Sequence, residues 1–150
     1  MISEDRLHHI IGVARKAYKL AIDLGYDEQY ARQMFAIGWN HDIGYEFDPE
    51  HHQIAGAESL KDWKYSFYIK THGHVEYDKW DNPKIDLSWF IINYADLTTS
   101  PTGEEVTLDE RLAEIESRYG KEHTWYKETK EVIDVLKQAE ANLEEWRYYD

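Results

Sequence analysis

The chain has 150 residues, no cysteine and a formal net charge of −13, from 30 acidic and 17 basic residues. This length fits a single domain over residues 1–150, and the acidic charge argues against nucleic-acid polymers and anionic membranes as partners. No apolar run is long enough to cross a bilayer and the first residues do not form a secretory signal, so we expect a cytoplasmic location.

The first predicted helix covers residues 4–24 and ends at Gly25. At 100° per residue, the two neighbouring histidines lie on different sides of this helix. His9 falls at the edge of the apolar face, whereas His8 falls among charged residues. We therefore expect His9 rather than His8 to face the core.

A second helix is predicted between Asp27, a typical N-cap residue, and Gly44. Its apolar stripe ends in His41, which is followed directly by Asp42. An imidazole and a carboxylate that face a core are costly unless a partner satisfies them. The pair His41-Asp42 is therefore a candidate functional element.

A shorter helix is predicted around residues 52–60, followed by an aromatic segment at 63–69. The dipeptide Asn82-Pro83 has a cap residue before a proline and predicts the start of a helix whose stripe ends in Asp96.

Two C-terminal helices are predicted within residues 107–145, at 109–119 and at 124–142. We expect the tail at 144–150 to be frayed or docked on a neighbour. No segment alternates convincingly enough for a sheet, so the expected fold class is all-α, a compact helical bundle.

Four residues from three predicted helices could share one partner. A divalent metal would satisfy all of them at once, because neutral imidazole nitrogens and carboxylate oxygens are its usual ligands. Each has a simpler explanation alone: a capped helix end, a histidine bonded to a backbone carbonyl, or a carboxylate that caps a turn. Since the simpler explanations need three separate coincidences, we expect a metal centre between the helices, formed by His9, His41, Asp42 and Asp96.

The ordered pattern His9…His41-Asp42…Asp96 resembles the HD superfamily of metal-dependent phosphohydrolases. The motif core covers residues 9–96, and residues 94–120 are similar to a little-characterised bacterial subgroup. The resemblance implies an HD-domain helical bundle with a buried metal. It also implies a phosphohydrolase that uses metal-activated water to cleave a phosphoester or phosphoanhydride of a small substrate, with a nucleotide as the expected partner.

The resemblance extends to a second metal. His52 and His72 match the spacing of binuclear HD enzymes, including the diadenosine tetraphosphate hydrolases and the cyclic dinucleotide phosphodiesterases. In that arrangement Asp42 would bridge two ions, with His52 and His72 on the second. His51 and His74 are the alternatives at these two places. One or two ions, and Fe, Mn, Mg, Co, Ni or Zn, all stay open, because ligand type fixes neither number nor identity.

Catalytic roles can be assigned only in outline. Asp42 would also orient the attacking water, and His72 or His74 could protonate the leaving group if it is not a ligand. Many HD hydrolases carry a lysine three residues after the aspartate, where this chain has Tyr45.

Other candidates concern substrate contacts and packing. Lys70 and Lys79 could meet substrate phosphate, and Tyr45 and Phe47 follow the motif closely enough to meet a ligand. Three further aromatic residues at helical spacing are expected to be packing residues of the core or of an interface: Trp39, Trp89 and Tyr94.

Two other classes of protein remain compatible with the sequence. One is a noncatalytic HD module that binds a nucleotide or a partner protein and uses metal only for structure. The other is a helical protein with incidental histidines, which would hold no stoichiometric metal. The oligomeric state is open, and a homo-oligomer is compatible with the sequence.

Overall fold

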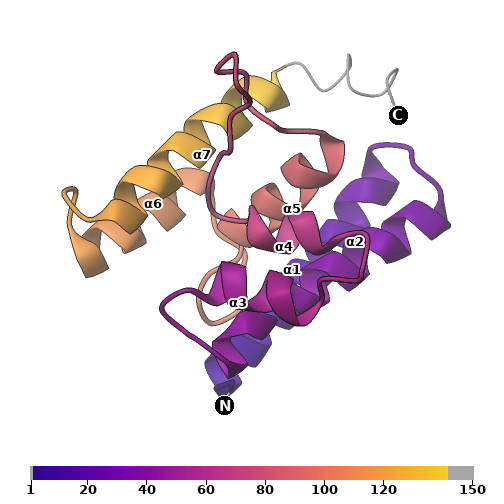
Figure 1. Cartoon of the computed structure of the whole chain (residues 1–150), viewed down its shortest axis with the longest axis horizontal. Helices are drawn as coiled ribbons and strands as arrows, with labels where there is room; N and C mark the ends of the chain where they lie inside the picture. The colour runs from indigo at the N-terminus through magenta and orange to yellow at the C-terminus, as the bar shows by residue number, and fades with distance from the viewer. Residues whose placement is uncertain (1, 142–150) are drawn as a thin grey trace.

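The computed structural model describes residues 2–141, and these residues form helices and connecting loops (Figure 1). The expected all-α class is confirmed: the described residues contain two isolated β-bridges and no strand. The elements are α1 (Glu4–Asp23), α2 (Glu28–Asn40), the short 3₁₀ helix η1 (Ile43–Glu46), α3 (His52–Ser59), α4 (Ser66–Lys70), α5 (Leu87–Leu97), α6 (Leu108–Tyr119) and α7 (Thr124–Glu140).

The first two helices form a closely packed hairpin. Gly25 has a φ of +94°, which suits glycine, and it follows α1 as predicted; Asp27 caps α2 by accepting a hydrogen bond from a backbone N–H of the first turn. A Cβ at Gly38 would lie only 2.9 Å from the Cα of Ala14. The absence of a side chain at Gly38 therefore lets α2 approach α1 and brings the end of α2 close to His9.

Helix α5 forms the centre of the core. It runs between the α1–α2 hairpin and the α6–α7 pair, and it packs against all four of these helices (Figure 1). Nine of its eleven residues are buried, which is typical of a helix that is apolar on every side. Each fully buried aliphatic or aromatic side chain contributes about 1.5–3 kcal/mol. This packing fixes the position of Asp96 near the end of the helix.

The helix start predicted at Asn82-Pro83 is wrong. Helix α5 begins at Leu87, and Asp86 is its N-cap. Pro83 instead forms an isolated antiparallel bridge with Tyr77 in the preceding loop. Proline fixes φ near −65° and lacks an N–H donor, and both properties suit an extended loop as well as the first turn of a helix. The local sequence therefore did not distinguish the two.

The C-terminal helices have the predicted positions within about two residues. A capping box between Thr107 and Glu110 begins α6, and Gly120, with a φ of +84°, follows its last residue. The predicted end of the last helix and the tail at 144–150 lie outside the described residues. Among the described helices, none combines the length and apolar character needed to span a bilayer.

Of the three aromatic residues expected to be packing residues, two pack in or against the core and the third lies at the surface. Trp89 is buried and Tyr94 is partly buried against the core. Trp39 is 45% exposed and stacks on Phe35, which also lies on α2. The one-turn spacing of these two rings explains the contact without any burial in the core.

Candidate metal centre

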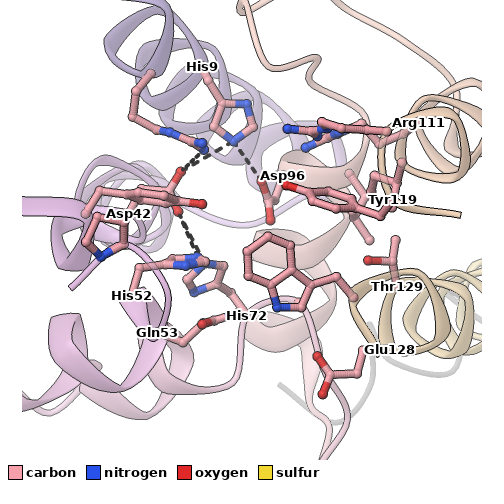
Figure 2. Close-up of a pocket in the computed structure, with 18 of the residues that line it drawn as sticks. His9, Asp42, His52, Gln53, His72, Asp96, Arg111, Tyr119, Glu128 and Thr129 are labelled. Atoms are coloured by element: carbon pink, nitrogen blue, oxygen red, sulfur yellow. Dashed lines mark hydrogen bonds and ion pairs between the residues drawn. The ribbon is translucent and has the colours of Figure 1, made fainter. Parts of the chain in front are cut away.

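The six predicted ligands lie on or beside six elements and converge into one buried cluster. Figure 2 labels five of them, all except His41. Four of them lie at or just after the C-terminal ends of helices: His41, Asp42, His72 and Asp96. His9 is on α1, His41 ends α2, Asp42 precedes η1, His52 opens α3, His72 follows α4, and Asp96 lies near the end of α5. Their exposed fractions run from 0% for His41 to 9% for His52.

The first group of donor atoms surrounds Asp96. His9 Nε2 lies 2.8 Å from Asp96 Oδ1, and His41 Nε2 lies 3.4 Å from the same oxygen. Asp42 Oδ2 completes the group at 3.2 Å from His41 Nε2 and 3.7 Å from His9 Nε2.

The second group surrounds the other oxygen of Asp42. His72 Nε2 lies 3.3 Å from Asp42 Oδ1, His52 Nε2 lies 3.6 Å from it, and the two Nε2 atoms are 3.1 Å apart. Figure 2 shows Asp42 between His9 on one side and His52 and His72 on the other. The two oxygens of one carboxylate therefore face two separate sets of histidine nitrogens.

Backbone carbonyls fix which nitrogen of three histidines points into the cluster. A carbonyl oxygen can only accept, so in the neutral imidazole the Nδ1 atom carries the proton and Nε2 presents a lone pair. A ligand histidine is typically held in this way by an outer hydrogen bond. The bonds join His9 Nδ1 to the carbonyl of Ser100 at 2.9 Å, His41 Nδ1 to that of Gly38 at 2.6 Å, and His72 Nδ1 to that of Ile69 at 2.6 Å.

Lone pairs that face carboxylate oxygens repel unless a cation lies between them. His41 Nε2 makes no hydrogen bond to any residue between 2 and 141, and the same holds for His52 Nδ1. Without a metal, a proton bound to a histidine can take this place. Burial disfavours charge on His41, but the carboxylates of Asp42 and Asp96 outweigh it and raise the pKa of His41 well above its usual value.

The pKa values of the two carboxylates and of His52 are lowered, in contrast to that of His41. Burial disfavours the charge on both aspartates, yet His41 and His72 hold the pKa of Asp42 well below its usual value, and His41 and His9 do the same for Asp96. Burial, and then the charge of His72, lower the pKa of His52 to about 3. Both carboxylates are thus ionised and His52 is neutral near pH 7, which are the forms that bind metals.

The distances fit ions of ordinary coordination geometry. Ligand atoms about 2.1 Å from a metal are about 3.0–3.4 Å from each other at angles between octahedral and tetrahedral. The measured separations, 2.8 to 3.7 Å in the first group and 3.1 to 3.6 Å in the second, scatter around this range. Two overlapping triads have ligand atoms that all lie within 4.8 Å of one another: His9, His41 and Asp96, and His41, Asp42 and His72. The residues present therefore fit one or two divalent ions.

The neighbouring histidines lie outside the cluster. His8 is exposed, as its position on the helix predicts. His51 is exposed and pairs with Asp48, and His74 is partly exposed and lies 3.6 Å from Glu76. The structure therefore places His52 rather than His51, and His72 rather than His74, in the cluster.

A cavity of about 340 Å³ opens from the cluster toward α6 and α7. Tyr45 lines it, as predicted, and stacks on the ring of His52 at 4.2 Å. Phe47 is 63% exposed and does not line it. Lys70 pairs with Glu76 outside the cavity.

The cavity cations are arginines that sequence reasoning missed. Arg6 donates to Asp42 Oδ2 at 3.0 Å and lies 4.0 Å over the ring of Tyr45, while Arg111 and Arg118 line the opposite wall. Lys79, predicted to meet phosphate, instead lies over a surface tryptophan. The three-residue spacing from Arg6 to His9 places both on one helix face and was the one signal that could have indicated Arg6.

The resemblance to the HD superfamily stays a prediction from the motif. Comparison of the chain with models of protein families, with curated proteins and with solved structures found no match.

Proposed function

We propose that this chain is a metal-dependent phosphohydrolase that cleaves a phosphoester or phosphoanhydride of a small substrate. The observation that carries the proposal is the set of three histidines whose Nδ1 atoms are tied to backbone carbonyls and whose Nε2 atoms face two buried, ionised aspartates. His9 Nε2 lies within hydrogen-bond distance of Asp96 Oδ1, and His72 Nε2 of His52 Nε2, but His41 Nε2 has no hydrogen-bond partner among the described residues and is left to be bridged by a cation.

The ligands would divide between two places. His9, His41, Asp96 and one oxygen of Asp42 would hold the first ion, and the other oxygen of Asp42 with His52 and His72 would hold a second. A divalent ion bound there supplies positive charge for a phosphoryl oxygen and lowers the pKa of a coordinated water.

The chain's own residues would position the reactants. Asp42 can accept a hydrogen bond from the attacking water and orient it toward phosphorus. The water oxygen forms the new P–O bond, the bond to the leaving oxygen breaks, and the leaving oxygen takes up a proton. If only the first ion binds, His72 Nε2, which presents a lone pair, can take up the proton released by the attacking water and pass it to the leaving oxygen; if both bind, His72 is a ligand and solvent carries that proton. His74 does not line the cavity.

The proposal is tested by metal analysis together with a substrate screen. Protein purified without a histidine tag is analysed for bound metals and assayed against phosphomonoesters, phosphodiesters and nucleotides. We expect at least one stoichiometric ion and turnover of at least one substrate. Asp42→Asn should lose both. Asp48→Asn is the matched control, because Asp48 is an exposed aspartate that pairs with the exposed His51.

Two results would contradict the proposal. One is a chain that takes up no divalent metal under any loading condition, and the other is undiminished turnover in Asp42→Asn. A chain that holds metal and binds ligand but cleaves nothing in the screen would instead be a noncatalytic binding module.

A further inference from the structure

The arginines of this chain gather in one place. The sequence has six arginines and eleven lysines, and three of the arginines line the cavity beside the candidate metal centre: Arg6, Arg111 and Arg118. None of the described lysines lines it. Four carboxylates line the same cavity, those of Asp42, Glu50, Asp96 and Glu128. A guanidinium group can therefore favour an anion there only where it keeps an N–H donor that no carboxylate has already taken.

Two of the three guanidinium groups already have partners. Arg6 is held by Asp42 Oδ2 at 3.0 Å and by the face of Tyr45. Arg118 is 42% exposed at its side chain, and it pairs with Glu114 at 2.9 Å, four residues earlier on α6. Neither arrangement leaves an obvious buried donor for a ligand.

Arg111 differs in both burial and pairing. Its residue is only 9% exposed, its Nη1 donates to the same Glu114 carboxylate, and its Nε makes no hydrogen bond to any residue in the described part of the chain. One carboxylate is therefore shared by two guanidinium groups. A buried N–H donor without an acceptor is costly, so this side chain is poised for an acceptor that comes from outside the chain.

The Arg111 side chain also lines the cavity beside the candidate metal centre. Figure 2 shows Arg111 and Tyr119 on the wall of the cavity that faces Asp96 and the histidines. A guanidinium presents several N–H groups in one plane, which matches the oxygens of a phosphate in bidentate fashion. The cavity volume, about 340 Å³, is near the lower end for small-molecule sites and suits a small anion rather than a polymer.

We propose that Arg111 is the anion-binding residue of this cavity, that it binds the phosphate group of the substrate from the side opposite the metal centre, and that Glu114 is its competitor in the empty cavity. This inference rests on the proposed function for the identity of the substrate, but the anion site itself needs only the cavity. An anion that enters draws the guanidinium away from Glu114 and satisfies the unpaired Nε donor.

Inorganic phosphate is the probe, and its dissociation constant is measured by titration calorimetry on the full chain with and without added metal. Arg111→Gln should weaken phosphate binding by about tenfold or more, the effect of losing a charge-assisted hydrogen bond. Glu114→Gln should tighten it by about threefold or more, because the competing carboxylate is gone. A variant that merely unfolds cannot produce this gain.

A surface pair on α2 provides the matched controls. Arg32 and Glu28 are also four residues apart and pair at 2.9 Å, but both are exposed. Arg32→Gln and Glu28→Gln make the same changes in net charge, and we expect both to leave phosphate affinity unchanged. Unchanged affinity in Arg111→Gln would overturn the inference, and so would a gain in Glu114→Gln that Glu28→Gln reproduces.

The experiment separates this inference from the proposed function. Metal content is measured on every variant, and Arg111→Gln should retain the ions of the unmodified chain. Turnover and bound metal without any Arg111-dependent phosphate binding would refute the anion site and leave the proposed function standing. Phosphate binding through Arg111 in a chain that takes up no metal would refute the proposed function and leave the anion site standing.

Discussion

Replacing Gly44 with alanine should damage one half of the metal centre more than the other. A Cβ at Gly44 would lie 1.7 Å from the carbonyl oxygen of His52 and 2.8 Å from the backbone nitrogen of Gly56. Contacts under 3.0 Å are essentially never seen for real Cβ atoms, so η1 and α3 must separate by at least about 1.3 Å. Both of these contacts are with backbone atoms, which cannot rotate out of the way.

This displacement is large compared with the tolerance of a metal site, which is about 0.2 Å in each ligand distance. His52 opens α3 and would move with it, so we expect Gly44→Ala to lose the second ion while His9, His41 and Asp96 keep the first. Overpacking should also lower the free energy of unfolding by about 1–3 kcal/mol. For a chain of this size, each kcal/mol lowers the melting temperature by about 2–4 °C.

Metal content and thermal melting of the same samples test this prediction. Gly25→Ala is the control, because a Cβ there meets nothing within 4 Å but the φ of +94° makes alanine strained. That variant should lose about 1–2 kcal/mol of stability and keep the metal content of the unmodified chain. A Gly44→Ala variant that retains both the original melting temperature and the original number of ions would contradict this prediction.

Three further predictions concern the cap of α5 and the charges of the centre. Asp86→Ala should lower the free energy of unfolding in urea by about 1 kcal/mol, because the Asp86 carboxylate accepts from the backbone N–H of Trp89 at 2.9 Å; Asp62→Ala on the surface should cost much less. Since the pKa of His41 is raised, metal binding near neutral pH should expel about one proton from it, seen as a binding heat that depends on the ionisation enthalpy of the buffer; a buffer-independent heat would contradict this. The metal-free chain should melt highest near pH 6.5. The raised pKa of His41 gives stability that is lost as pH rises through it, and the lowered pKa of His52, about 3, gives stability that is lost as pH falls from 6.5 toward 3. A melting temperature that keeps rising into alkaline pH would refute that pair of assignments.

Helical periodicity could predict much of the fold because the signals are local. The 100° step between neighbouring residues placed His9 in the core and His8 in solvent, and the structure shows this arrangement. The start of α5 could not be found in the same way. Asn82-Pro83 and Asp86 are both good start signals within five residues, and the packing of Trp89 in the core decides between them.

The contacts that complete the centre could not be predicted from local pattern. The approach of Gly44 to α3 depends on backbone atoms, which leave no trace in the spacing of side chains. Arg111 has the pattern of a surface residue, with a glutamate three residues later, and its burial arises only when α6 packs beside α5. Long-range packing, rather than residue type, therefore determines which arginine reaches the cavity.

The balance of charge links the two proposals. Near neutral pH the metal-free centre holds two negative charges, on Asp42 and Asp96, and two positive charges, on Arg6 and on His41, whose pKa is raised. Once a metal displaces the proton of His41, the protein groups carry a net charge of −1 in a buried site. One divalent ion would change this to about +1 and two ions to about +3, and a buried excess of either sign is costly without a counter-charge. A hydroxide together with a phosphate group supplies that counter-charge. The positive charge of Arg111, across the cavity, also favours a bound anion. The metal-free centre, whose charges balance, should therefore add little to phosphate binding by Arg111, whereas a centre loaded with metal should strengthen that binding.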